Sequence, residues 1–368
     1  MHGTDDNQGL RQLIRKVADA AYEAAPDTRL LFVTNLREGE IFDIGPEGIS
    51  NIAQYYSRRQ ADEIIRSFQD LGLTVESFFT ENDFLESILS QDPGGERRRV
   101  VYSTAEGGHG SGRRALIPAI CSLLSIPAMN CGAHASSMVR HKFHSYTVLR
   151  SVGVRVPETW QFTDGTWVGG LAPALGTRVI VKPIYESMGI GVGDDSVRIV
   201  NDSFPAYLQE KQRSFGQPAV VQEFISGDEV GVPVARIGAA YALPPVAQRR
   251  ADGTNYDGVP KTFRDEHLDG DISLARFEAP ASQLLALRQA AALAFESLDM
   301  QGAGRIDFRV DADGRAWAFD TNGEPPPLAN TSWAFSMGIL GLSFQDMLAL
   351  WLGMCMFDHG LISRVRPE

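Results

Sequence analysis

Short apolar runs alternate with helical patterns along the first 135 residues. Residues 30–35 (LLFVTN), 74–79 (TVESFF) and 98–103 (RRVVYS) are short and rich in β-branched or aromatic side chains, which predicts strands. Apolar side chains with helical spacing predict helices at 10–24, 60–72, 83–90 and 113–126. Strands and helices that alternate at this spacing predict an open, largely parallel α/β sheet.

The pattern changes near residue 140. Beyond it, strands are joined by hairpins and by long loops that carry Gly and Pro, with helices predicted at 136–151, 281–298 and 343–353. This order is typical of α+β structure. We therefore expect an N-terminal parallel α/β domain, a small central α+β domain and a C-terminal antiparallel-sheet domain, with bounds at 1–140, 141–221 and 222–368.

Residues 304–324 (GRIDFRVDADGRAWAFDTNGE) predict a β-hairpin. The Asp313-Gly314 dipeptide favours a two-residue turn, and that turn fixes which residues face each other. The apolar face then pairs Ile306 with Thr321, Phe308 with Phe319 and Val310 with Trp317, and the other face pairs Arg305 with Asn322 and Asp307 with Asp320. A three-residue turn with a bulge is the alternative, and it would put the two aspartates on different faces.

The first of these registers places two carboxylates opposite each other. Directly opposed Cβ atoms lie about 4.5–5.5 Å apart, where like charges destabilise the pairing unless a cation lies between them. The hairpin therefore indicates a cation beside Asp307 and Asp320.

The acidic balance of the chain limits its partners. A formal net charge of −12 argues against nucleic acid or an anionic membrane as the main partner, which leaves small molecules. Cys121, Cys131 and Cys355 are odd in number and lack metal-ligand spacing, so we expect reduced thiols. No apolar run reaches the roughly 20 residues that span a bilayer. The composition favours a cytoplasmic enzyme with a cleft between domains.

A Gly-rich stretch, AEGGHGSG (105–112), follows a predicted strand and opens a predicted helix. Backbone N–H groups bind anions in that setting, but the glycines are spaced wrongly for a dinucleotide fingerprint. We interpret the stretch as a loop facing a cleft, in which His109 either contacts substrate or is solvated.

Two later segments carry signals for ligand binding that are weak when taken singly. VIVKPIYESMGIGV (179–192) places Lys182 at the end of a strand and before a glycine loop that lets backbone approach phosphate. VVQEFISGDEVGV (220–232) is an apolar strand with Gln222 that leads to Glu229. Each is also compatible with ordinary surface structure.

The order of these motifs resembles that of ATP-grasp enzymes. A helix lysine (Lys142), a strand lysine before a glycine loop, a strand leading to an acid, and a hairpin with two opposed carboxylates and an asparagine follow one another. From about residue 98 to 352 the chain resembles the D-alanyl-D-alanine ligase branch of that superfamily, and residues 322–344 fit its pattern without a gap. The resemblance implies the ATP-grasp fold and an ATP-dependent carboxylate–amine ligase.

The resemblance also implies which residues bind the nucleotide. They are Lys142 and Lys182 for the phosphates, Glu186, Gly189 and Gly191 in the lid loop (186–191) over the phosphates, Gln222, Glu223, Phe224 and Ile225 for the adenine edge, and Glu229 for the ribose.

The reacting groups follow from the same resemblance. Asp307, Asp320 and Asn322 match the Mg²⁺ ligands, which would account for the opposed carboxylates, and Mn²⁺ is an alternative metal. Arg305 matches an arginine that stabilises charge on the reacting carbonyl, and Lys261 matches a lysine that reaches the γ-phosphate.

The chain departs from the family pattern around the substrates. Met188 stands where the family has a loop serine and Thr262 where it has a tyrosine, so we expect a rebuilt first-substrate pocket. Pro326 replaces a glycine whose N–H contacts the intermediate. Thr331 and Ser332 occupy positions that bind the carboxylate of the second amino acid in the family.

These observations predict a ligase that joins a small carboxylate to an amine through an acylphosphate, with ATP and Mg²⁺ as cofactors. D-alanyl-D-alanine formation for the cell wall is the runner-up, and a nucleotide-binding homologue without catalysis is a third hypothesis. No nucleic acid or membrane partner is expected. Because related ligases are often dimers, a homodimer is part of the expectation.

Overall fold

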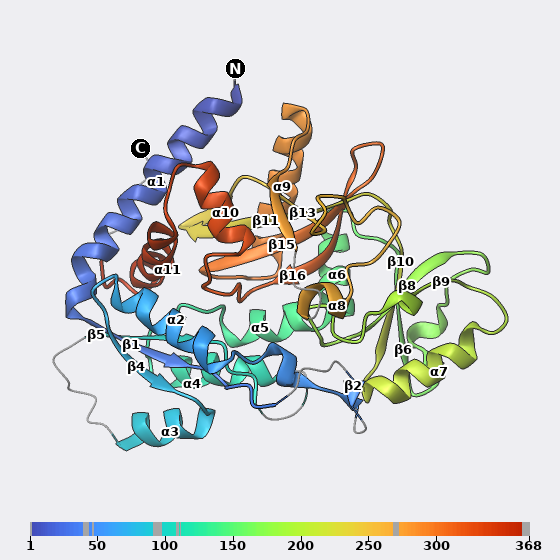
Figure 1. Cartoon of the computed structure of the whole chain (residues 1–368), viewed down its shortest axis with the longest axis horizontal. Helices are drawn as coiled ribbons and strands as arrows, with labels where there is room; N and C mark the ends of the chain where they lie inside the picture. The colour runs from blue at the N-terminus through green and yellow to red at the C-terminus, as the bar shows by residue number, and fades with distance from the viewer. Residues whose placement is uncertain are drawn as a thin grey trace.

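The computed structural model describes residues 2–39, 44–45, 48–90, 98–107, 110, 112–267 and 272–362. Figure 1 shows three units around a common centre: a blue-to-cyan unit, a green to yellow-green unit and a yellow-to-red unit. Each unit is built on a sheet of its own.

The first unit holds a parallel sheet, as the alternating pattern predicts. Its order is β4-β1-β5, and Leu31 lies between Glu76 and Val101. Helix α2 begins at a capping box, in which Ser57 Oγ accepts from Gln60 N and Gln60 Oε1 accepts from Ser57 N. The elements of this unit are β1 (Thr28–Val33), β4 (Thr74–Phe78), β5 (Arg98–Ser103), α2 (Arg58–Gln69), α3 (Glu81–Ser90), α4 (Leu116–Leu123) and the short paired strands β2 (Ile44–Gly45) and β3 (Gly48–Ile49).

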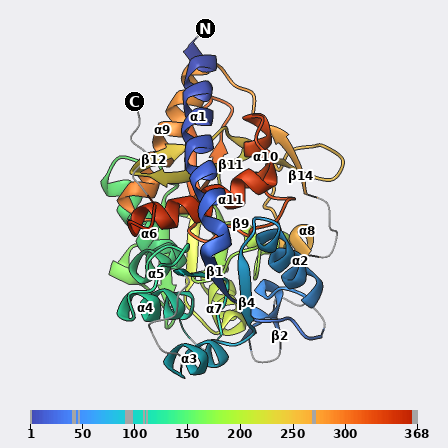
Figure 2. The same cartoon turned by 90° about the vertical axis from the view of Figure 1, so that its left-hand side faces the viewer.

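Helix α1 (His2–Ala24) packs against the last described helix of the chain. Its apolar stripe, which includes Ile14 and Val17, shares one core with Met347 and Trp351 of α11 (Phe344–Asp358). Figure 2 shows α1 crossing in front of α11. A Cβ at Gly353 would lie 2.7 Å from Val17 Cγ1, so the contact requires glycine there. The last described helix therefore completes the core of the first unit.

The second unit is a sheet in the order β7-β6-β10-β8-β9, with antiparallel pairs throughout. Its elements are β6 (Thr159–Thr163), β7 (Thr166–Trp167), β8 (Arg178–Pro183), β9 (Val197–Ile199), β10 (Ala219–Glu223) and α7 (Phe204–Phe215). Val179 and Val181 of β8 pack with Phe215 of α7. Side chains alternate along a strand, so Lys182 lies on the opposite face of this sheet.

The third unit carries the predicted hairpin in a sheet of order β14-β13-β11-β15-β16, with β12 paired to β11. Ile306, Phe308 and Val310 form one core with α9, which confirms the predicted apolar face of the hairpin strand. The other face, with Asp307, is left for a cleft. The elements are β11 (Asp228–Ile237), β12 (Ala239–Ala242), β13 (Val246–Arg249), β14 (Ser273–Arg276), β15 (Ala303–Val310), β16 (Ala316–Asn322), α8 (Phe263–His267), α9 (Ala281–Ser297) and α10 (Ser332–Ile339).

Near the turn, the hairpin has the register of the three-residue alternative, shifted by one from the two-residue prediction. Asp311 N donates to Arg315 O at 3.0 Å, so the loop is longer than the two residues predicted, and Val310 faces Ala316. The predicted pairs Phe308–Phe319 and Val310–Trp317 are therefore wrong.

A bulge at Phe319 then restores the predicted register. Beyond it, Asp307 faces Asp320 and Arg305 faces Asn322, as predicted. The longer turn shifts the register by one residue, and the bulge, which adds one residue to one strand only, shifts it back. The two aspartates therefore still face each other.

The helix predicted at 136–151 is two helices, α5 (Ala133–Arg140) and α6 (Lys142–Ser151). His141 lies between them with φ −89° and ψ 89°, and its ring accepts a hydrogen bond from His144 N. The capping side chain begins a new helix, which sets Lys142 in the first turn of α6.

All three cysteines are buried and form no disulfide, as expected from their spacing. Within the described ranges, no helix is by itself both long and apolar enough to cross a membrane. Helices α10 and α11 meet that criterion only as a pair, and they are bent by 105° relative to each other.

Candidate active site

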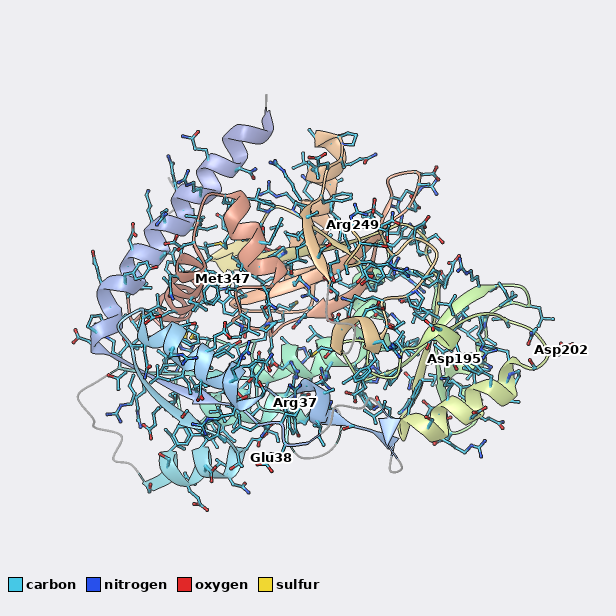
Figure 3. The ribbon with its side chains drawn as sticks, viewed as in Figure 1. Arg37, Glu38, Asp195, Asp202, Arg249 and Met347 are labelled. Atoms are coloured by element: carbon cyan, nitrogen blue, oxygen red, sulfur yellow. The ribbon has the colours of Figure 1, made fainter. Side chains whose placement is uncertain are left out.

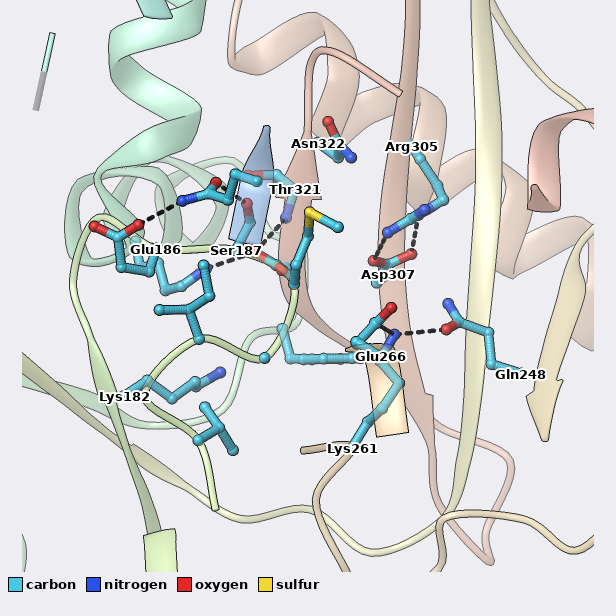
Figure 4. A pocket seen from close by; sticks show the side chains of 18 of the residues that line it. Lys182, Glu186, Ser187, Gln248, Lys261, Glu266, Arg305, Asp307, Thr321 and Asn322 are labelled. Carbon is cyan, nitrogen blue, oxygen red and sulfur yellow. Dashed lines mark hydrogen bonds and ion pairs between the residues drawn. The ribbon is translucent and has the colours of Figure 1, made fainter. Parts of the chain in front are cut away.

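A cleft of about 470 Å³ lies where the three sheets meet. It is lined by every predicted site residue except Gly191: Lys142, Lys182, Glu186, Gly189, Gln222, Glu223, Phe224, Ile225, Glu229, Lys261, Arg305, Asp307, Asp320, Asn322, Thr331 and Ser332. Gly191 packs behind the loop instead, where a Cβ would lie 2.9 Å from Pro183 Cγ. The sequence motifs therefore converge on one site (Figure 4).

The acid pair, Asp307 and Asp320, is held by two cations. Arg305 donates from Nε and Nη2 to the two oxygens of Asp307, both at 2.7 Å, and Lys142 Nζ donates to Asp320 Oδ1 at 2.9 Å. Burial raises the pKa of Asp307 even though Arg305 acts to lower it. Burial also acts on Asp320, but Lys142 and Lys182 outweigh it and lower the pKa of that carboxyl.

The acid pair offers the ligand chemistry that Mg²⁺ prefers. Within the described part of the chain, no three His, Cys, Asp or Glu side chains are grouped to hold a metal. A cation here would rely on the two carboxylates, the amide oxygen of Asn322 and phosphate oxygens, a usual set for Mg²⁺. Asn322 Oδ1 accepts from Glu324 N at 2.8 Å, which orients that oxygen. Two opposed carboxylates and an amide oxygen on adjacent strands of one cleft are hard oxygen donors, so the residues present fit a divalent cation.

Lys182 lies across the cleft from the hairpin. Its Nζ donates to Gln222 Oε1 at 3.0 Å and lies 5.5 Å from the centre of the Phe319 ring. The bulge therefore turns Phe319 towards the cleft. Burial, and then the charge of Lys142, lowers the pKa of Lys182 to about 7. An anion bound here would restore its charge.

Lys261 comes from the segment before α8. Its Nζ lies 2.7 Å from Gln248 Oε1, 2.5 Å from Glu266 Oε1 and 3.4 Å from Glu229 Oε1. Burial acts against the charged form, but Glu266 and Glu229 raise the pKa of Lys261. The ammonium group is therefore charged and aimed at the same cleft.

Glu229 is 2% exposed and lies at the start of β11. Its Oε2 lies 3.1 Å from Arg309 Nη2 but accepts no hydrogen bond from a described residue, which leaves acceptor capacity for a ligand. The linker 222–225 passes beside it, and Phe224 lies below the guanidinium of Arg309.

The two predicted hydroxyls differ in availability. Thr331 Oγ1 caps α10 by accepting from Ala334 N at 3.3 Å and donates to Leu328 O at 2.9 Å. Ser332 is 5% exposed, and its Oγ has no hydrogen-bond partner among the described residues. Ser332 is thus the better placed of the two to contact a ligand.

Sequence reasoning missed an arginine cluster, which we define as Glu106 with Arg113, Arg114 and Arg140. Glu106 is fully buried and accepts from all three arginines, at 2.6–3.2 Å. Burial opposes ionisation, but Arg114 and Arg140 lower the pKa of Glu106 to about 2. The only sequence signal was an acid just after a strand and an Arg-Arg pair opening a helix.

The cluster borders the cleft at the end nearest the first unit. Arg114 Nη1 donates to Glu324 Oε2 at 3.1 Å, and Arg140 Nε is buried without a partner among the described residues. Arg37 is half-buried on the same cleft and makes no ion pair with a described residue. Figure 3 shows Arg37 near the middle of the molecule, far from Asp195. His109, for which a substrate contact and a solvated side chain were both open, lies outside the described residues.

Comparison with known protein families gives one consistent result. The family model described as "D-ala D-ala ligase C-terminus" matches residues 148–352. The D-alanine–D-alanine ligase of Bordetella petrii is 29% identical over 228 residues, 61% of this chain and 67% of its own length. The D-alanine–D-alanine ligase of Laribacter hongkongensis is 26% identical over 288 residues, 77% of this chain and 86% of its own length.

Solved structures share the fold. The D-alanine–D-alanine ligase of Bacillus anthracis, solved with ATP, has a TM-score of 0.66 and 15% identity over 90% of this chain and 99% of its own. The VanG D-Ala:D-Ser ligase of Enterococcus faecalis has a TM-score of 0.64 and 16% identity over 89% of this chain and 99% of its own.

Proposed function

The chain belongs to the D-alanine–D-alanine ligase family of ATP-grasp enzymes, which are ATP-dependent, ADP-forming carbon–nitrogen ligases, and on that premise we propose which of its residues carry the reaction. The observation that carries the proposal is the acid pair. Its two aspartates face each other on neighbouring strands and line one cleft together with Arg305 and three lysines.

The nucleotide lies between the second and third sheets in this proposal. Lys142 and Lys182 bind its phosphates, as suits point charges on flexible stems. The linker 222–225 reads the adenine edge, and Glu229 accepts from the ribose hydroxyls. The acceptor capacity left on Glu229 Oε2 supports this role.

Asp307, Asp320 and Asn322 would hold a magnesium ion, which would supply positive charge to the phosphate oxygens of the nucleotide. Lys142 and Arg305, which pair with the two aspartates in this structure, would serve the phosphate and the acyl carbonyl respectively.

The reaction proceeds in two displacements. A carboxylate oxygen of the acyl donor attacks the γ-phosphorus, the bond to the bridging oxygen breaks, and ADP leaves. The amine then attacks the acyl carbon, the bond from that carbon to phosphate breaks, and the amine loses a proton. Lys261 positions the γ-phosphate, and Arg305 donates to the oxygen that becomes negative on the acyl carbon. Positioning and charge stabilisation, not covalent work by side chains, supply the rate.

The substrate end favours an acyl donor other than D-alanine. Arg37, Arg140 and Gln54 line the cleft there and offer polar groups to the acyl donor. The unpartnered Arg140 Nε favours a donor that brings an additional acceptor, such as a second carboxylate. The free Ser332 Oγ is available to the amine substrate.

Phosphate release from Mg-ATP across a panel of neutral and acidic amino acids tests the proposal. We expect turnover with a polar or acidic acyl donor and an amine, with an amide as product. Vigorous activity with D-alanine alone would favour the cell-wall alternative. Mg-ATP binding without turnover for any pair would favour a homologue without catalysis.

A further inference from the structure

The loop over the phosphate end of the cleft is tied to the first unit by buried polar contacts. Glu186 is 3% exposed, and its Oε2 accepts from Arg113 Nη2 at 2.9 Å and from Gln54 Nε2 at 2.8 Å. Ser187 Oγ accepts from Arg140 Nη1 at 2.9 Å and donates to Gln54 Oε1 at 3.0 Å. Two consecutive loop residues are thus bonded to three side chains from another unit.

The next turn of the loop is held by apolar contacts. Ile190 is 1% exposed and forms a small core with Ala53 of the first unit and Phe263 of the third. A Cβ at Gly189 would lie 2.7 Å from Phe263 N, and Phe263 N donates to Val192 O at 3.1 Å. All three units therefore meet on residues 186–192.

The donors of these polar contacts are themselves fixed. Glu106 accepts from Arg113 Nε at 3.2 Å and from Arg140 Nη2 at 2.6 Å, and Gln54 Oε1 accepts from Arg140 Nη2 at 2.7 Å. Charged hydrogen bonds with both partners buried hold a fixed geometry. The first unit thus presents a preformed surface to the loop.

We infer that Gln54, Arg113 and Arg140 are positioning residues that hold the loop 186–192 closed over the reacting phosphate and exclude water from it. The inference rests on the proposed function for the identity of the covered group. A closed loop favours attack by the acyl donor, since water that reaches a γ-phosphate causes wasteful hydrolysis. Gln54 and Arg140 also line the substrate end, so the groups that hold the loop face the acyl donor.

The test is Gln54→Ala in the full chain. It removes the hydrogen bonds of Gln54 to Glu186 and Ser187, so we expect amide hydrogens of residues 186–192 to exchange roughly tenfold faster with Mg-ATP bound. The kcat for amide formation should fall by a similar factor, with a larger share of ATP hydrolysed to phosphate without amide. The KM for ATP should change less, because the phosphate-binding lysines are untouched.

Two controls separate a positioning role from general damage. Gln69→Ala, at the exposed end of α2, should match the wild type in every measurement. Gln217→Ala removes two 2.9 Å bonds within the loop's own unit, one to Glu186 Oε1 and one from Tyr185 N. Because neither bond ties the loop to the first unit, the variant should leave the hydrolysed share unchanged. If Gln54→Ala does not fold, Ser187→Ala removes one of the same contacts by deleting a hydroxyl.

The inference would be overturned if both variants, Gln54→Ala and Ser187→Ala, matched the wild type in two measurements. These are the exchange rate of the amide hydrogens of residues 186–192 and the fraction of ATP hydrolysed without amide formation. The exchange measurement needs only Mg-ATP binding. If the wild-type protein forms no amide from any tested pair, the proposed function fails. The exchange measurement still decides in that case whether the loop is held.

Discussion

The two ends of the cleft use the same charged groups in opposite ways. In the acid pair, each carboxylate meets one cation, as in Lys142–Asp320, and the Asp320 side chain is 28% exposed. In the arginine cluster, Glu106 is fully buried and bonded by three guanidinium groups. Single pairs can be exchanged for a ligand, whereas a saturated cluster fixes a geometry.

The pKa shifts follow the same division. Burial lowers the pKa of Lys182 to about 7, and it raises the pKa of Asp307 because its effect outweighs the single guanidinium of Arg305. Burial also acts on Glu106, but the surrounding arginines lower its pKa to about 2. The first end is prepared for additional ions, whereas at the second end Glu106 is fully satisfied and, among the buried side-chain atoms of the described cluster, only Arg140 Nε has no hydrogen-bond partner.

The largest effect is expected from Glu106→Gln. Removing one member of a buried charge network leaves guanidinium groups uncompensated, which costs about 3–5 kcal/mol in the free energy of unfolding. Denaturant unfolding measures it, with the exposed Glu63→Gln as control. A loss below that of the control would mean that the cluster contributes little.

The pH dependence of the same variant is a further readout. The folded pKa of Glu106 lies below the unfolded one, so its stabilisation is complete above the unfolded value and is lost as pH falls towards 2. Glu106→Gln should therefore lose less stability than the wild type between pH 4.5 and 2.

A somewhat smaller effect is expected from Asp320→Asn in the acid pair. Loss of a charge that acts on the transferring group costs roughly 10²–10³-fold in turnover, about 2.7–4 kcal/mol. ATP-dependent phosphate release over a range of Mg²⁺ concentrations measures it. Asp313→Asn, on the exposed turn of the same hairpin, is the matched control. Equal rates in the two variants would remove the acid pair from the reaction.

Above the pKa of Lys182, the free energy of ATP binding is expected to weaken by about 1.4 kcal/mol per pH unit. Its amine is protonated below about pH 7 and neutral above, so ATP binding at pH 8 should take up a proton and weaken as pH rises. Calorimetry in two buffers of different ionisation enthalpy measures how many protons are taken up when ATP binds. Lys182→Arg stays charged and should abolish the uptake. An unchanged pH slope in that variant would assign the proton to another group.

The smallest effect concerns the turn that sets the hairpin register. Gly314 has φ +76°, and a Cβ there would lie 2.3 Å from Gln283 Nε2, so Gly314→Ala should cost about 1 kcal/mol of stability. Gly338→Ala, in α10 with no atom within 4 Å of the added Cβ, should be neutral or stabilising. Equal thermal stabilities for the two variants would show that the positive φ at Gly314 carries no cost.

The acid pair was predictable because the evidence for it is local. The alternating side chains and the turn dipeptide predicted Asp307 opposite Asp320, and the structure has that pair although its turn is longer than predicted. The bulge at Phe319 was not predictable, because it depends on how the longer turn and the neighbouring strands accommodate each other. Even so, the bulge preserved the pairing that matters.

The arginine cluster was beyond sequence reasoning for a physical reason. Its members come from a loop, the turn before α4 and the end of α5, and arginines at such positions are ordinarily solvated. Only the fold brings Arg113 and Arg140 to Glu106. The acid pair lies within one hairpin, and the lysines of the cleft were expected from the order of motifs, whereas the arginine cluster had neither signal.

The packing of α1 against α11 has a consequence for biosynthesis. Translation at about 5–20 residues per second separates the emergence of these helices by tens of seconds. Throughout that interval, the stripe with Ile14 and Val17 lacks its packing against Met347 and Trp351. Apolar surface exposed in this way during synthesis is prone to aggregation and is the kind of surface that chaperones bind.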